Sequence, residues 1–118
     1  MKIELYQKQV KEKVVSAMFD YMSEDEDCGY SKKDVKKCER VLLKYLAKLN
    51  RLKNPTDETI MEQVKTVVLA LNKLNEKTEY SLIETDARED IWQIIQDSAV
   101  ECGLSSATED VTEEWREW

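Results

Sequence analysis

The stretch SKKDVKKCERVLLKYLAKLNRLKNP, residues 31–55, is the most informative part of the chain because it contains a helix start, a long interior and a helix stop. Ser31 and Asp34 have the spacing of a capping box, with Asp in place of Glu. Asn54 stands before Pro55, and the residue before a proline disfavours helical backbone. Between these signals, apolar side chains recur in alternating steps of three and four residues, the period of an amphipathic helix: Val35, Cys38, Leu42, Tyr45, Leu49 and Leu52.

Similar patterns lie on both sides of this stretch. Residues 2–22 predict a helix whose buried face is Ile3, Tyr6, Val10, Val14, Ala17 and Tyr21. Thr56 or Asp57 can cap a third helix, whose buried face is Ile60, Val64, Val67, Leu71 and Leu74. The spacing of each set predicts one apolar face that packs against neighbouring helices.

Two more helices are expected in the last third of the chain. The longer one begins at Ser81 or Thr85 and ends at Gly103, a residue suited to the left-handed C-cap conformation. Its apolar positions are Ile83, Ala87, Ile91, Ile94, Ile95 and Cys102. Thr108 can then cap a short acidic helix, on which Val111, Trp115 and Trp118 share one face.

These elements predict a single all-α domain over residues 1–118. The length of 118 residues matches one domain, and a count of two Gly and one Pro is too low for the many turns of an all-β protein. Short connections favour antiparallel neighbours. We therefore expect an up-down antiparallel bundle of four helices plus a short C-terminal fifth.

The composition excludes several classes of chemistry. The chain contains no histidine, which removes the commonest general base, the usual zinc ligand and every Ser-His or Cys-His nucleophile pair. It has three cysteines, an odd number with no CxxC pair, which does not indicate a disulfide framework. Cys38 and Cys102 fall on apolar faces, so they are expected to be buried thiols. The sequence shows no apolar run long enough to span a membrane, and its N-terminus does not resemble a secretory signal. Together with the cysteine pattern, this favours a cytoplasmic protein.

Charge is segregated along the chain, although the net charge is −7. Residues 31–53 contain nine Lys and Arg against two Asp and Glu, whereas residues 80–118 contain two against eleven. The cations of the first segment lie opposite its apolar face: Lys33, Lys36, Lys37, Arg40, Lys44, Lys48 and Arg51. Such a stripe could follow the phosphates of a nucleic acid. The acidic net charge and the position of Tyr45 on the apolar face favour a solvated surface instead.

The segment SLIETDARED, residues 81–90, concentrates carboxylates near a helix start. Most of its charges fit helix initiation, with Ser81 and Glu84 as a capping box and Glu84 and Arg88 as a pair one turn apart. The alternative is a carboxylate site for Mg²⁺ or Mn²⁺ in an all-α hydrolase. Its ligands would come from the third and fourth helices: Glu58, Glu62, Glu84 and Asp90.

Two acidic segments predict protein binding. TEDVTEEWREW, residues 108–118, combines acids with two tryptophans, which are common interface anchors but can also close a core, and SEDED, residues 23–27, forms a second acidic patch. The expected partner-binding residues are Glu109, Asp110, Glu113, Glu114, Trp115, Trp118, Glu24 and Asp25. An acidic surface attracts a basic partner quickly. The favoured expectation is a non-enzymatic immunity or inhibitor protein, without a cofactor, that occludes a basic bacterial toxin such as a nuclease.

Residues 71–89, LNKLNEKTEYSLIETDARE, resemble a segment of a family of small helical bacterial proteins classed as a domain of unknown function. The matching positions are Leu71, Asn72, Leu74, Glu76, Ser81, Ile83, Glu84, Thr85, Ala87, Arg88 and Glu89. The resemblance implies an all-α fold and a bacterial or phage-like origin. It implies no catalytic residue, since the family has no assigned activity.

Overall fold

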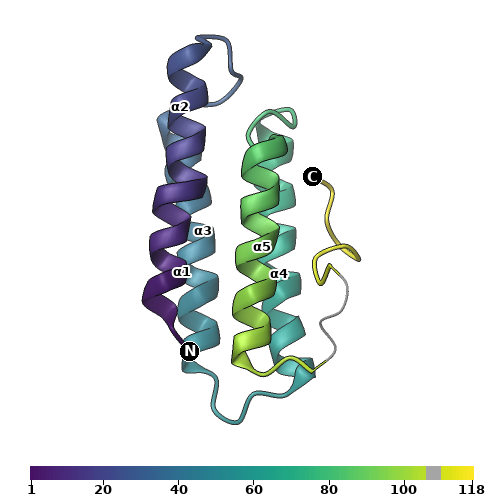
Figure 1. Cartoon of the computed structure of the whole chain (residues 1–118). Coiled ribbons are helices and arrows are strands. Elements are labelled where there is room, and N and C mark those ends of the chain that lie inside the picture. Colours follow the sequence, from purple (N-terminus) through teal and green to yellow (C-terminus); the bar gives the residue numbers. More distant parts are fainter. Residues whose placement is uncertain (106–109) are drawn as a thin grey trace.

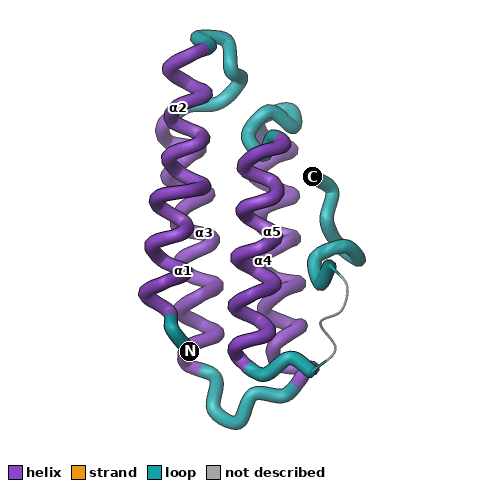
Figure 2. Tube along the Cα trace, in the orientation of Figure 1, coloured by secondary structure: helices purple, strands orange, loops and turns teal. Residues whose placement is uncertain are grey.

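The computed structural model describes residues 1–105 and 110–118, and its regular secondary structure in these ranges is entirely helical (Figures 1 and 2). The first rod is continuous and combines α1 (Ile3–Gln9), a π-helical segment η1 (Val10–Val15) and α2 (Ser16–Glu24). The other rods are α3 (Lys32–Arg51), α4 (Asp57–Lys77) and α5 (Thr85–Cys102). The predicted all-α class is therefore confirmed.

The four rods lie side by side, and successive rods run in opposite directions (Figure 1). Each contributes apolar side chains to one shared core, including Val14, Leu42, Leu71 and Ile95, all fully buried. Within the described ranges, no helix is both long enough and apolar enough to span a membrane.

The helix starts predicted for α3 and α4 are confirmed by their capping contacts. The Asp34 amide donates to Ser31 Oγ (3.4 Å), and the Ser31 amide donates to Asp34 Oδ2 (2.9 Å). Thr56 caps α4 in the same reciprocal way, with Thr59 as its partner. The backbone amides in the first turn of a helix have no acceptor within the helix. The capping side chains accept hydrogen bonds from these amides and so set where each rod begins.

The first rod corrects the predicted buried face beyond Val14. Ala17 and Tyr21 were expected in the core, but Ala17 is half-buried and Tyr21 is 41% exposed; Val15 and Met18 are buried instead. The π-helical segment explains the shift, because it adds a residue to one turn and rotates all later side chains. The sequence contains a sign of this shift: apolar residues recur at every fourth position from Val10 to Met22. A step of four residues is about 0.4 residue longer than one α-helical turn, so this spacing does not keep to one face of a regular α-helix.

The α4–α5 connection is built around the buried side chain of Asn75, which is 2% exposed. Its Oδ1 accepts a hydrogen bond from the Ile83 amide (3.0 Å), and its backbone carbonyl accepts one from the Tyr80 amide (2.8 Å). Thr78, also buried, accepts from the Leu82 amide through Oγ1 (3.2 Å). The bonds to the amides of Leu82 and Ile83 satisfy buried backbone groups.

The start of α5 corrects the proposed Ser81–Glu84 capping box. The helix begins at Thr85 with Glu84 as its N-cap, and no side-chain hydrogen bond caps it. Ser81 instead lies in the connecting turn, where its amide donates to the Thr78 carbonyl (3.1 Å). The side chains of Glu84 and Arg88 form none of the ion pairs found between described residues; their contact is the helical bond from the Arg88 amide to the Glu84 carbonyl (2.7 Å).

All three cysteines are free thiols. Cys38 is completely buried, and burial raises the pKa of its thiol to about 12. Cys102 is only half-buried, with its Sγ 3.7 Å from the Leu49 carbonyl oxygen. The prediction of a buried thiol is thus confirmed for Cys38 and too strong for Cys102.

Candidate protein-binding site

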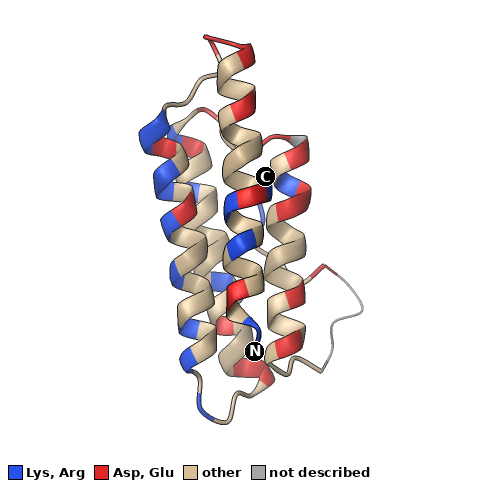
Figure 3. Cartoon of the chain, turned by 60° about the vertical axis from the view of Figure 1, so that its left-hand side comes forward, with Lys and Arg blue, Asp and Glu red and all other residues tan. Residues whose placement is uncertain are grey.

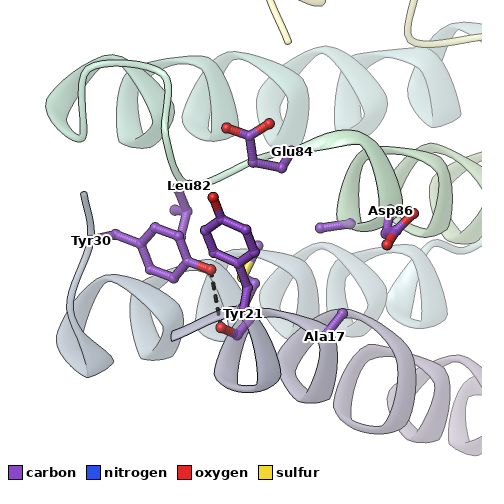
Figure 4. Close-up of a pocket in the computed structure, with 8 residues that line it drawn as sticks. Ala17, Tyr21, Tyr30, Leu82, Glu84 and Asp86 are labelled. Carbon is purple, nitrogen blue, oxygen red and sulfur yellow. Dashed lines mark hydrogen bonds between the residues drawn. The ribbon is translucent and has the colours of Figure 1, made fainter. Parts of the chain in front are cut away.

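A cleft of about 250 Å³ opens between α2 and the start of α5 (Figure 4). We call it the acidic cleft. It is lined by Ala17, Tyr21, Tyr30, Leu82, Glu84 and Asp86, together with Met18 and Ala87. These residues come from three places in the sequence: the first rod after its π-helical segment, the loop before α3, and the start of α5.

The π-helical segment supplies one wall of the acidic cleft. By rotating the later part of the first rod, it takes Ala17 and Tyr21 off the core face and turns them toward the start of α5. Ala17 and Ala87 face the opening with small side chains, which leaves room between the helices. The same backbone irregularity that made the sequence prediction fail beyond Val14 therefore creates this hollow.

The aromatic wall consists of two stacked tyrosines. The rings of Tyr21 and Tyr30 have centroids 6.4 Å apart and an interplanar angle of 16°. The Tyr30 hydroxyl donates to the Met18 carbonyl oxygen (3.0 Å), which fixes that ring in place (Figure 4). Burial, with smaller contributions from nearby groups including Glu84, raises the pKa of Tyr30 to about 12, so its phenol stays neutral at ordinary pH.

Glu84 and Asp86 give the cleft its charge. Both are exposed, and neither takes part in the ion pairs found between described residues. The exposed loop at the end of α2 adds further unpaired acids next to this end of the rods (Figure 3): Glu24, Asp25, Glu26 and Asp27. Stacked aromatic rings beside free carboxylates suit an organic cation, because a guanidinium or ammonium group gains from both.

The loop before α3 meets the α4–α5 turn at Gly29. This glycine has a φ of +92°, and a Cβ built on it would lie 2.5 Å from Ser81 Oγ. The two loops therefore touch at a point where no larger residue fits. The contact joins the segment carrying Tyr30 to the segment carrying Leu82 and Glu84, so it holds two walls of the acidic cleft together.

The C-terminal tail, residues 110–118, differs from the expected fifth helix. Its described residues form turns and irregular backbone without a helix, and the expected cap at Thr108 lies outside the described residues. Asp110 accepts from the Thr112 amide (2.9 Å), a local bond that competes with helical pairing. Trp115 and Trp118 are half-buried and pack against the core, so much of their surface is already used within the chain.

The charges of the tail are also partly used. Asp110 forms an ion pair with Arg116 (2.7 Å), and the Arg116 guanidinium lies 5.4 Å from the centre of the Trp118 ring. Glu113 and Glu114 are exposed, whereas Glu109 lies outside the described residues. Of the expected binding residues, the freest in the described part of the chain are Glu24, Asp25, Glu113 and Glu114.

Asn72 on α4 fastens the tail to the bundle with both ends of its amide. Its Nδ2 donates to the Trp115 carbonyl oxygen (2.6 Å), and its Oδ1 accepts from the Glu117 amide (3.0 Å). On α5, Gln96 accepts from the Val111 amide through Oε1 (3.3 Å). The tail, with its turn at residues 111–115, is thus held against α4 and α5 by these hydrogen bonds.

We expect Asn72→Ala to release the tail while leaving the four rods folded. Loss of two hydrogen bonds from a buried amide should lower the free energy of unfolding by about 1–2 kcal/mol. Tryptophan fluorescence should shift to longer wavelength as Trp115 and Trp118 become hydrated, and proteolysis should remove the tail faster. Asn50→Ala, at an exposed position on α3, is the matched control. Unchanged fluorescence in Asn72→Ala would contradict the role of this amide.

The four carboxylates of the metal-site alternative do not come together. Glu58 and Glu62 lie in the first turns of α4, whereas Glu84 and Asp90 lie at the start of α5, toward the other end of the rods (Figure 1). From the helical rise, Glu62 and Glu84 are separated by roughly 20 Å along the rods. A shared ion requires ligand oxygens at about 2–2.6 Å. Across the described residues, no three His, Cys, Asp or Glu side chains are grouped to hold a metal.

Comparison with protein-family models, curated proteins and solved structures finds no match to this chain. The resemblance of residues 71–89 therefore stays an expectation. In the fold, these residues form the end of α4, the Asn75-centred turn and the start of α5. Their contacts favour a structural role, because the turn sets the position of Leu82 and Glu84 in the acidic cleft.

Proposed function

We propose that this chain is a non-enzymatic interaction protein that binds a basic protein partner through the acidic cleft. The observation that carries the proposal is the gathering of unpaired carboxylates around a tyrosine-walled hollow. A lysine or arginine side chain of the partner fits this chemistry, with its alkyl stem against the rings and its charge beside Glu84 and Asp86.

Physical considerations favour a protein partner over a free small cation. The acids of the loop after α2 extend the negative surface beyond the cleft, and the net charge of −7 attracts a basic partner from a distance. The cleft is lined by residues of helices that pack against one another, and a site that exists before binding lowers the cost of binding. Glu113 and Glu114 on the tail provide a second acidic surface for a partner large enough to reach it.

This combination suits an immunity or inhibitor protein of a bacterial toxin system. A nuclease toxin has a basic active site because its substrate is a polyanion, and an acidic protein can occlude that site by competing for the same cations. Free thiols fit action in the cytoplasm, where such a protein would protect the cell.

Affinity capture with matched variants tests the proposal. The whole chain serves as bait in an extract of its source organism, and bound proteins are eluted with salt. We expect a basic protein on the wild-type bait and on the tail variant Glu113→Gln/Glu114→Gln. Glu84→Gln/Asp86→Asn, which removes the same number of charges, should lose it, because only this pair lies in the acidic cleft.

The captured protein then decides the functional class. We expect its toxic or nuclease activity to fall in proportion to added chain and to reach zero near equal molar amounts. Recovery of the same proteins on the wild-type bait and on Glu84→Gln/Asp86→Asn would overturn the role of the acidic cleft. A captured partner whose activity the chain leaves unchanged would overturn the inhibitor assignment.

A further inference from the structure

A second groove of opposite charge runs between α3 and α4, which are packed against each other along their lengths. This groove consists of two neighbouring hollows of about 310 and 130 Å³ that meet at Val41 and Ala70, the two residues that line both. We call it the basic groove. It lies outside the acidic cleft and shares no lining residue with it.

Cations flank the basic groove on both sides. α3 supplies Lys37, Arg40, Lys44 and Lys48, and α4 supplies Lys73 and Lys77. All six are exposed, and none of them takes part in the ion pairs found between described residues. Figure 3 shows the line of cations along α3. The positive charge is therefore free to act on a ligand.

The floor of the basic groove is apolar. Val41 and Ala70 are half-buried and line both hollows, and the buried side chains of Val67 and Leu74 line one hollow each. A ligand that fills the groove must bring apolar side chains to this floor and negative charges to the cationic sides. On α3 the cations from Lys37 to Lys48 cover about 16 Å, or three turns of a helix.

We propose that the basic groove binds an acidic amphipathic helix of a protein partner. Such a helix places an apolar stripe on the floor and its flanking carboxylates against the cations of α3, the usual mode of helix-in-groove recognition. Nucleic acid fits less well. Single strands are held by stacking on exposed aromatic rings, whereas the aromatic residue lining this groove, Tyr45, is only 3% exposed.

The sequence alone favoured a solvated face for the cations of α3. What changes that interpretation is the position of Lys73 and Lys77 on the facing helix, together with the apolar floor between the two rows. Charge from two helices converges on one depression, an arrangement that a single-helix pattern does not reveal. The chain then has two faces for partners of opposite charge.

A labelled synthetic peptide tests the proposal. The probe is an amphipathic helix of about 15 residues, four turns, with leucines on one stripe and glutamates beside it. Its scrambled version has the same composition but no stripe. We expect fluorescence anisotropy to show salt-sensitive binding of the probe to the whole chain and much weaker binding of the scrambled peptide, because only the first presents an apolar face.

Matched variants locate the binding. Lys37→Glu/Arg40→Glu should weaken it by at least about tenfold, whereas Lys11→Glu/Lys13→Glu, with the same charge change on η1, should stay within about twofold. Ala70→Phe fills the floor without changing charge and should also weaken binding, provided that circular dichroism shows an unchanged fold. Glu84→Gln/Asp86→Asn should bind the probe normally, which separates this test from that of the acidic cleft.

Three results would overturn the proposal. If the scrambled peptide bound as tightly as the probe, charge attraction alone would explain binding, and the apolar floor would have no role. Tighter binding of single-stranded DNA, at the same salt concentration, would assign the groove to nucleic acid. If Lys37→Glu/Arg40→Glu and Lys11→Glu/Lys13→Glu lost binding equally, the peptide would not bind specifically in the basic groove.

Discussion

Asn75→Ala is expected to lower the free energy of unfolding by about 2–3 kcal/mol, because it leaves the buried Ile83 amide without its acceptor. For a chain of this size, the melting temperature should fall by about 10 °C. Thermal and urea unfolding followed by circular dichroism measure both quantities. The loss should exceed that of Asn72→Ala, whose two hydrogen bonds hold only the tail.

The same substitution should weaken partner binding at the acidic cleft. Asn75 contributes no atom to the cleft, but its turn positions Leu82 and Glu84, which do. Asn50→Ala, at an exposed site, should change stability by less than about 0.5 kcal/mol. An Asn75→Ala chain that unfolds like this control would show that the turn does not depend on the buried amide.

Gly29→Ala is expected to cost about 2–3 kcal/mol, because two effects add. The backbone φ of +92° is unfavourable for a residue with a Cβ, and that Cβ would meet Ser81 Oγ at 2.5 Å and Ser81 Cβ at 2.7 Å. Thermal unfolding measures the loss. Binding at the acidic cleft should also weaken, because moving Ser81 shifts the neighbouring wall at Leu82.

Gly103→Ala separates the two effects. Gly103 also has a positive φ, +123°, but a Cβ there would have no neighbouring atom within 4 Å. It should therefore show the conformational cost alone, about 1 kcal/mol, and leave the acidic cleft unaffected. The double variant Gly29→Ala/Ser81→Gly should recover the part caused by the clash. Equal losses for Gly29→Ala and Gly103→Ala, or no recovery, would contradict the close contact.

The helices were predictable because their signals are local. The Ser31 and Thr56 caps, the stop before Pro55 and the C-cap at Gly103 each depend on residues a few positions apart. Apolar periodicity then identified most of the core, including Leu42, Leu71 and Ile91. Such patterns reflect which face of a helix is removed from water, and neighbouring residues are enough to define it.

The candidate sites were less predictable because they depend on contacts between distant segments. The carboxylate of Glu84 is evident in the sequence, but the tyrosines that share its cleft, Tyr21 and Tyr30, lie more than fifty positions away along the chain. A regular helical period through Val15 places Tyr21 in the core, and the π-helical segment breaks that period. The apolar spacing of the tail predicts a fifth helix, but its described residues form turns and irregular backbone that Asn72 and Gln96 bind to the bundle.

Taken alone, the sequence determined the all-α class, the approximate extent of the four rods, the segregation of charge and the lack of any histidine. Each of these follows from composition or from short-range backbone and side-chain preferences. The tertiary structure decided which charges are unpaired and which side chains face one another: the π turn brought Tyr21 to Glu84, and the packing of α3 on α4 brought Lys73 beside Arg40. A cleft forms only where two helices or loops meet, so these arrangements depend on how the rods pack and not on the sequence of any one rod.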